Sequence, residues 1–175
     1  DCVPAGLDAG SIVVSARTAD GVGLFLLDPT AAGAEVIRQD TTNHIPEARL
    51  VLSAAPAALL VEGAEALEWT RQHAVTALCA MGIGVFDKEV RMTAEYTSTR
   101  KQFDKPLAHF QAVGQRAADA YIHVEAIRLT AWEAIWKLDR DLPARVAVHV
   151  AKFTAADGAA ELIAREVGLA GHVEV

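Results

Sequence analysis

The chain has 175 residues, of which 52% are hydrophobic and 22% are charged. This composition is typical of a globular protein with enough apolar material for one ordinary domain or two small ones. The 16 basic and 23 acidic residues give a formal net charge of −7, which disfavours nucleic-acid binding because that function usually needs a basic stripe.

The sequence carries no targeting or membrane signal that we recognise. No apolar run reaches the length of a membrane span, and the N-terminus lacks the basic and apolar regions of a secretory signal. Cys2 and Cys79 are too few for a disulfide framework, so we expect a cytoplasmic protein in which Cys79 is a small core residue. Because the chain begins at Asp1 rather than Met, a fragment of a longer polypeptide is one interpretation.

Residues 1–60 are predicted to form strands. Apolar runs at 11–16 and 22–27 flank Asp20-Gly21, a pair typical of hairpin turns. Two more strands are expected at 35–39 and 49–52, with a polar loop between them. Four strands are few for an independent sheet, so we interpret residues 1–60 as part of an antiparallel β domain.

From Val61 the apolar spacing becomes helical. It predicts long helices over 64–97, 108–138 and 144–167, joined by short loops. Three such helices predict an antiparallel bundle over residues 61–175, which makes the chain α+β. Trp132 and Trp136 lie one turn apart, and we interpret them as core or interface residues rather than a ligand pocket.

The clearest chemical pattern lies between the first two predicted helices. It consists of Tyr96, Arg100, Phe103, Pro106 and Gln111. An arginine at a helix end offers a fixed fork of donors to a pyrophosphate, and a glutamine one turn into the next helix can hydrogen-bond a nucleotide. The alternative is that the arginine compensates the helix dipole and the glutamine is solvated. Five matched positions favour the binding interpretation.

This pattern resembles the signature of the acyl-CoA dehydrogenase family, roughly Tyr-x-x-x-Arg-x-x-Phe-Gly-x-Pro-x-x-x-x-Gln, with Asp104 in place of the glycine. The strands resemble the latter part of the family's middle β domain, and the helices resemble the first three of its C-terminal bundle. Gly82 and Lys152 match a small residue and a lysine of the family's first and third helices. The family's N-terminal helical domain is not represented in these residues.

The resemblance implies FAD as cofactor and an acyl-CoA thioester as substrate. It implies α,β-dehydrogenation, in fatty-acid or steroid side-chain β-oxidation, with electron-transfer flavoprotein or a similar acceptor. By the same resemblance, Arg100 would bind the FAD pyrophosphate, Gln111 the adenosine side, and Phe103 would pack near the dinucleotide. In the family these groups usually reach the flavin of a neighbouring subunit, which implies a homo- or hetero-oligomer arranged as a dimer of dimers.

The catalytic base is not evident in the sequence. The family's usual glutamate would fall about three residues after Val175 by motif spacing, and Glu174 is a candidate only if the register slips. The alternative base position on the first helix holds Gln72, with His73 beside it; an amide cannot take a proton at neutral pH. The family also has a glycine-rich stretch at the end of its third helix, which should begin near position 168 here. Of the three glycines of that stretch, this sequence retains only Gly171.

Three interpretations follow. The chain is part of a catalytic acyl-CoA dehydrogenase, or it is a non-catalytic partner subunit of a heterotetrameric one, supplying Arg100 and Gln111 to FAD. A stand-alone helical interaction module is disfavoured because packing alone does not need the motif. Asp104 stands where the family usually has glycine. If this turn needs a positive φ, Asp tolerates it better than most residues, so both acyl-CoA dehydrogenase interpretations remain compatible with Asp104. In either case we expect the isolated chain to be inactive.

Overall fold

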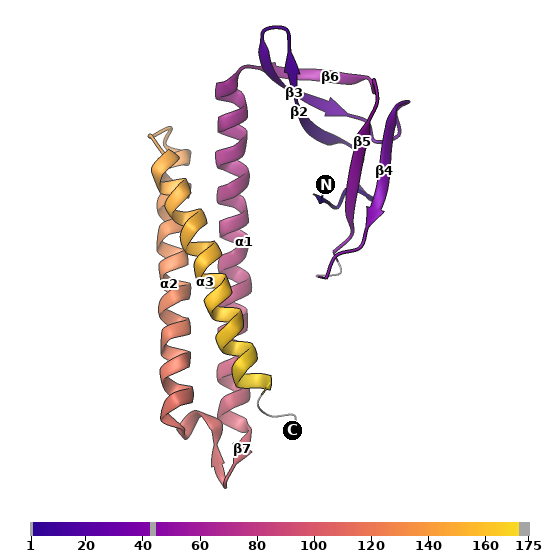
Figure 1. Ribbon diagram of the computed structural model, residues 1–175. Coiled ribbons are helices and arrows are strands. Elements are labelled where there is room, and N and C mark those ends of the chain that lie inside the picture. The colour runs from indigo at the N-terminus through magenta and orange to yellow at the C-terminus, as the bar shows by residue number, and fades with distance from the viewer. Residues whose placement is uncertain (1, 43–44, 172–175) are drawn as a thin grey trace. The chain divides into compact units, whose positions relative to one another are not determined.

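The computed structural model describes residues 2–42 and 45–171, with side chains up to residue 159 in the last helix. The chain forms two compact units, residues 1–70 and 71–175. The α+β class predicted from the sequence is confirmed, because antiparallel strands precede three long helices (Figure 1).

The first unit contains two small antiparallel sheets. One has the order β2 (Ile12–Thr18), β3 (Gly21–Leu27), β6 (Ala57–Glu62), and the other has the order β1 (Val3–Pro4), β5 (Glu47–Leu52), β4 (Ala34–Gln39). Buried side chains of this unit include Ile12, Leu24, Leu27 and Ala48. Ile12, Leu24 and Leu27 come from the apolar runs that predicted the strands, and Ala48 precedes the predicted strand 49–52.

Two details of this unit differ from the sequence prediction. Thr18 pairs with Gly21, so Ala19 and Asp20 form the hairpin turn, and Gly21 follows it with a φ of 143° that suits glycine. Strands β1 and β6 were not predicted, and β1 is only two residues long. For β6 the reason lies in its sequence. Its run of alanine, leucine and valine is too short to separate a strand from a helix by periodicity, and it pairs with β3 across an irregularity at Leu24 and Phe25.

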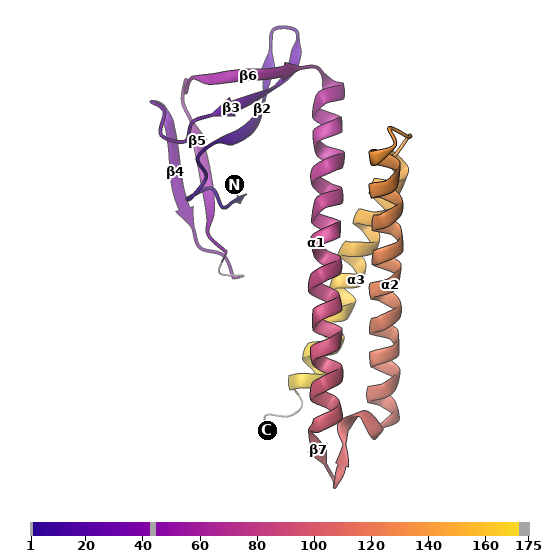
Figure 2. The ribbon, with the colours of Figure 1, turned by 180° about the vertical axis from the view of Figure 1, so that it is seen from behind.

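The helical unit is built from α1 (Ala64–Thr99), α2 (Gln111–Asp139) and α3 (Arg145–Gly171). Helix α1 begins in the first unit and continues through the second. Between α1 and α2 lie β7 (Lys101–Gln102), β8 (Lys105–Pro106) and a 3₁₀ turn, η1 (Leu107–His109). The helices lie side by side in both views, and α2 runs antiparallel to its two neighbours (Figures 1 and 2).

The helix bounds depart most from the predicted ones at the start of α2 and the end of α3. Helix α2 starts at Gln111 rather than 108, because residues 107–109 form the 3₁₀ turn and Phe110 is extended, with φ −83° and ψ 127°. Helix α3 continues to Gly171, four residues beyond the prediction. Trp132 and Trp136 are 58% and 53% exposed, so they are not core residues of this chain. A role at a subunit interface stays a prediction.

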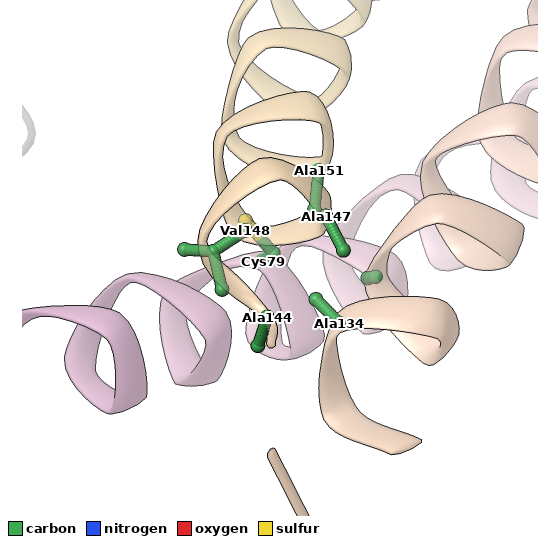
Figure 3. Packing of buried hydrophobic residues seen from close by; sticks show 7 residues of the cluster. Cys79, Ala134, Ala144, Ala147, Val148 and Ala151 are labelled. Carbon is green, nitrogen blue, oxygen red and sulfur yellow. The ribbon is translucent and has the colours of Figure 1, made fainter. Parts of the chain in front are cut away.

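Small side chains form the centre of the bundle. One cluster joins Cys79 of α1 to five alanines and a valine from α2, α3 and the residue before α3: Ala131, Ala134, Ala144, Ala147, Val148 and Ala151 (Figure 3). We call the five alanines the alanine seam. Alanine loses no side-chain rotamer freedom on folding, and its small volume allows helix backbones to approach closely. Cys79 is 4% exposed, which confirms it as a core residue, and burial raises the pKa of its thiol.

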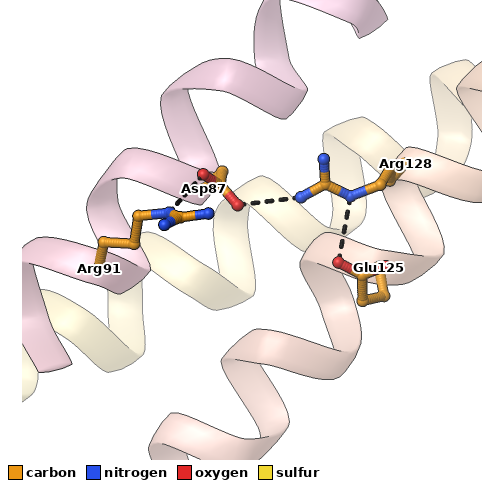
Figure 4. Close-up of polar contacts among 4 residues, drawn as sticks. All are labelled: Asp87, Arg91, Glu125 and Arg128. Carbon is orange, nitrogen blue, oxygen red and sulfur yellow. Dashed lines mark hydrogen bonds and ion pairs between the residues drawn. The ribbon is translucent and has the colours of Figure 1, made fainter.

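An ion-pair network connects α1 to α2 further along the bundle (Figure 4). The Asp87 carboxylate accepts hydrogen bonds from Arg91 at 2.7 Å and from Arg128 at 2.9 Å, and Arg128 also donates to Glu125 at 3.1 Å. The hydrogen bond from Arg91, assisted by that from Arg128, holds the pKa of Asp87 below its ordinary value of 3.8. The network fixes the register of the two helices between the bundle core and the segment that carries the sequence motif.

Candidate functional site

The C-terminal end of α1 is tied off by its own hydroxyl groups. Thr97, Ser98 and Thr99 donate hydrogen bonds to backbone carbonyls one turn earlier, at 2.8, 2.7 and 3.1 Å. The backbone N–H of Arg100 donates to the Tyr96 carbonyl at 2.9 Å. The backbone bond satisfies a carbonyl that the helix end would leave open, whereas the three side-chain bonds satisfy the hydroxyl groups themselves. Arg100 therefore follows directly after the last helical residue.

The next residues form a hairpin that the motif did not predict. Gln102 pairs with Lys105, which leaves Phe103 and Asp104 as a two-residue turn with φ values of 53° and 60°. Two positive φ values define a type I′ turn, whose twist matches that of paired strands. Asp tolerates this conformation, but for Phe it is an outlier, so the turn is strained at Phe103. We call residues 100–107 the site hairpin.

Aromatic and backbone contacts connect the site hairpin to α2. The Leu107 N–H donates to the Arg100 carbonyl at 2.9 Å, which extends the pairing beyond the two short strands. The Phe103 ring meets the Phe110 ring edge to face, with 6.5 Å between centroids, a favoured aromatic geometry. Phe110 is the residue before Gln111, so the turn and the start of α2 are held as one piece.

The three predicted binding residues lie within this piece. Arg100, Phe103 and Gln111 are all exposed, Phe103 at 86%. Within the part of the chain that the structure describes, the side chains of Arg100 and Gln111 have no hydrogen-bond or ion-pair partner. Asp104 has the positive φ under which we expected it to replace the family's glycine. The motif therefore forms a surface of free donors on a defined backbone.

The charge around the site hairpin is opposite to that of the chain. Residues 100–116 contain four basic side chains and one acidic one, namely Arg100, Lys101, Lys105 and Arg116 against Asp104. The whole chain has a net charge of −7. A local excess of exposed cations favours an anionic ligand. Lys101 and Lys105 are not part of the motif, and their positions follow only once the hairpin register is known.

The candidate bases are not brought to this site. Gln72 and His73 are half-buried on α1, and 27 to 28 residues of helix separate them from Arg100, which is roughly 40 Å at the helical rise. They cannot act on a group held by the site hairpin of the same chain. Glu174 lies outside the described residues, and Gly171 is the last residue of α3.

A hollow in the first unit has the wrong chemistry for a nucleotide. It has a volume of about 230 Å³, and apolar side chains of β2, β3, β5, β6 and the loop between the last two line it, among them Val14, Phe25 and Leu52. A binding site needs a few polar groups to orient its ligand, and the residues lining this hollow are all apolar.

Among the described residues, no group of His, Cys, Asp and Glu side chains is arranged to hold a metal, and none of the helices could span a membrane.

Comparison with known proteins decides the family. Residues 61–173, more than half of the chain, match the family model for the acyl-CoA dehydrogenase C-terminal domain. The chain belongs to the acyl-CoA dehydrogenase family. Acyl-CoA dehydrogenase FadE27 of Mycobacterium tuberculosis is 36% identical over 159 residues, a match that covers 85% of this chain and 43% of FadE27.

Two solved structures share the fold closely. The Tcur3481–Tcur3483 steroid ACAD, in a variant form, matches with a TM-score of 0.92 and 38% identity, over 99% of this chain and 48% of that one. The ChsE4–ChsE5 complex from M. tuberculosis matches with a TM-score of 0.92 and 35% identity, over 97% of this chain and 47% of that one. This acyl-CoA dehydrogenase chain thus spans less than half the length of each of these three relatives.

Membership of the acyl-CoA dehydrogenase family confirms the resemblance drawn from residues 96–111. The match of 61–173 covers the helical unit and the site hairpin, while the structural matches cover almost the whole chain. The individual roles of Arg100, Phe103 and Gln111 stay predictions, as does the division at residue 60.

Proposed function

We propose that this chain contributes to the FAD-dependent α,β-dehydrogenation of an acyl-CoA thioester by presenting the site hairpin and the start of α2 to FAD. Arg100 binds the diphosphate, Gln111 hydrogen-bonds the adenosine side, and Phe103 packs against the dinucleotide. The observation that carries this proposal is the motif itself, since it places an exposed guanidinium and an exposed amide, both without partners in the described residues, at the two ends of a braced turn.

The chemistry of these donors fits FAD. A guanidinium presents a planar fork that matches phosphate oxygens in pairs. The amide of Gln111 offers both donors and an acceptor to a sugar or base edge. When bound, the flavin accepts the hydride from the substrate, and protein groups position it and exclude water. The residues described here supply binding and orientation.

The catalytic base and the thioester contacts are assigned to other segments. Gln72 cannot take a proton, and its place on α1 is remote from Arg100. Two forms of the proposal remain: a catalytic polypeptide seen in part, or a non-catalytic partner subunit of a heterotetramer. The partner-subunit form is favoured by Gln72, which stands at the alternative base position. It is also favoured by two similar structures whose names each join two proteins, Tcur3481–Tcur3483 and ChsE4–ChsE5. The first of these is called a steroid ACAD, which favours a steroid side chain over a fatty acid as substrate.

The apolar surface of the helices supports an oligomer, which we propose to be a dimer of dimers. Large apolar side chains recur at helical spacing on exposed faces of all three helices: Leu78, Met81, Val85 and Met92 on α1, Leu129, Trp132 and Trp136 on α2, and Val146, Val150 and Phe153 on α3. Extended apolar surface of this kind marks a protein contact.

We further propose that electron-transfer flavoprotein or a similar acceptor takes the electrons and completes the reaction. The proposed compartment is the cytoplasm, where thiols such as the two free cysteines stay reduced.

The proposal is tested by Arg100→Ala in the assembled protein, with Arg140→Ala as the control. Arg140 is also an exposed arginine directly after a helix, at the other end of α2. Loss of a charge-assisted bidentate contact is worth about 1.5–3 kcal/mol, so FAD binding should weaken more than tenfold in Arg100→Ala and stay unchanged in Arg140→Ala. Flavin absorbance per mole of complex measures this. Equal flavin content in the two variants contradicts the proposal.

A further inference from the structure

The register of the site hairpin separates its side chains onto two faces. Gln102 pairs with Lys105, and Lys101 pairs with Pro106. The hydrogen bond from the Leu107 N–H to the Arg100 carbonyl places these two residues opposite each other as well. Because side chains alternate along a strand and paired residues share a face, Arg100, Gln102 and Lys105 belong to one face. Lys101 belongs to the other.

The shared face brings two long cationic side chains next to each other. Lys105 pairs with Gln102 and lies two residues from Leu107, which makes it the diagonal neighbour of Arg100. Diagonal neighbours in an antiparallel pair lie about 7–8 Å apart at the backbone, and both side chains are long enough to converge on neighbouring phosphate groups. Arg100, Gln102 and Lys105 are exposed, and within the described residues none of the three has a side-chain partner.

The backbone holds this arrangement in place. A one-residue slip of the register would move every hairpin side chain to the opposite face. The two-residue turn with positive φ at Phe103 and Asp104 fixes the register, and the contact between Phe103 and Phe110 fixes the turn against α2. The position of Lys105 beside Arg100 is therefore a property of the fold rather than of a mobile loop tip.

We propose that Lys105 is a second diphosphate-binding residue, which acts with Arg100 on the two phosphate groups of FAD. This rests on the proposed function, because it assigns a further residue to the same ligand. The two cations have different tasks. The Arg100 fork sets the orientation of one phosphate through paired hydrogen bonds, whereas the Lys105 ammonium is a compact point charge that neutralises the other. The Gln102 amide lies between them and can donate to an oxygen that bridges the two.

Lys101 provides a matched control within the same hairpin. It is also an exposed lysine and also belongs to one of the two short strands. A general attraction of FAD to positive charge would depend equally on both lysines, since they differ mainly in the face they occupy. Direct contact between FAD and a lysine side chain would instead make FAD binding depend on Lys105 and not on Lys101.

The experiment titrates FAD into the flavin-free assembled protein and measures Kd from the change in flavin fluorescence. Lys105→Ala should weaken FAD binding about tenfold, Lys101→Ala by less than about twofold, and Lys105→Arg should restore most of the affinity. The effect of Lys105→Ala should shrink as salt is raised, because exposed charges are screened. Lys105→Gln keeps the length of the side chain, and it replaces Lys105→Ala if the alanine variant does not assemble.

The outcomes separate this inference from the proposed function. If Arg100→Ala weakens FAD binding while Lys105→Ala leaves it unchanged, or while both lysine variants lose affinity equally, the assignment of Lys105 is overturned and the proposed function stands. If neither Arg100→Ala nor Lys105→Ala changes the Kd, both are overturned. A loss specific to Lys105, together with the loss in Arg100→Ala, supports the second contact.

Discussion

The alanine seam and the site hairpin occupy the same helical unit and are built in opposite ways. The seam consists of small apolar side chains, all buried, whose neighbours are other residues of the bundle. The site hairpin consists mostly of charged and polar side chains with one aromatic ring, and six of its eight residues are exposed, on a turn with two positive φ values. The first region is complete within the chain. The site hairpin has exposed hydrogen-bond donors and backbone strain at Phe103 that folding alone does not explain. Both features are typical of a binding surface.

This difference predicts that stability and flavin binding respond to separate substitutions, and the largest effect should come from the bundle core. Ile127 is fully buried beside Ala120 and Val124. Ile127→Ala should lower the free energy of unfolding by about 2–5 kcal/mol, and Ile127→Val by about 0.5–1.5 kcal/mol, because the cavity grows with each methyl group removed. Urea denaturation measures both.

The same two variants sharpen the comparison when FAD affinity is measured as well. Where the Ile127 variants remain folded, their Kd for FAD should equal that of the unsubstituted chain. Arg100→Ala should instead leave the stability unchanged and weaken FAD binding. A parallel loss of stability and flavin affinity across all three variants would mean that the two regions are not independent.

An intermediate effect is expected from the strained turn. Asp104 has a φ of 60°, a conformation that costs an L-residue such as alanine roughly 1–2 kcal/mol and costs glycine almost nothing. Asp104→Ala and Asp104→Gly both remove the carboxylate, so their difference isolates the backbone. The alanine variant should be less stable by about 1 kcal/mol, as measured by thermal unfolding. Equal stability would rule out the type I′ turn.

The smallest effect should come from the ion-pair network, where Asp87 is partly exposed to solvent. Its folded-state pKa is lowered below 3.8 by the hydrogen bonds from Arg91 and Arg128. A lowered folded-state pKa contributes stability that is fully present above the ordinary pKa and is lost as the pH falls through the folded-state value. Asp87→Asn should therefore have a slightly lower Tm at about pH 7, and the difference should disappear in acid. A difference that persists at about pH 2 would contradict the assigned cause.

Much of the fold could be predicted from the sequence, and the exceptions have physical reasons. The helices are predictable because apolar residues recur at helical spacing over many turns. Strand β6 is not, because alanine, leucine and valine in such a short run suit a strand and a helix equally. The start of α2 is predicted three residues too early because Leu107–His109 do turn, but as a 3₁₀ helix after Pro106.

The motif could be recognised in the sequence as a set of residues but not as a shape. The spacing of Arg100, Phe103 and Gln111 is enough to indicate the resemblance to the family, and the FAD-binding roles of these residues stay predictions. It does not indicate the hairpin, because Phe103-Asp104 lacks the Asn-Gly or Asp-Gly pair that usually marks a type I′ turn, and the two strands are only two residues long. The face shared by Arg100 and Lys105 depends on that register, which the sequence pattern does not determine.

The central claim is that the site hairpin contacts FAD in the assembled protein. A crystal structure of this chain together with its partner subunits and FAD tests it most directly. We predict that the Arg100 guanidinium lies within hydrogen-bond distance of the diphosphate and that the Gln111 amide lies near the adenosine. A structure in which FAD is bound while the site hairpin faces bulk solvent would contradict the claim.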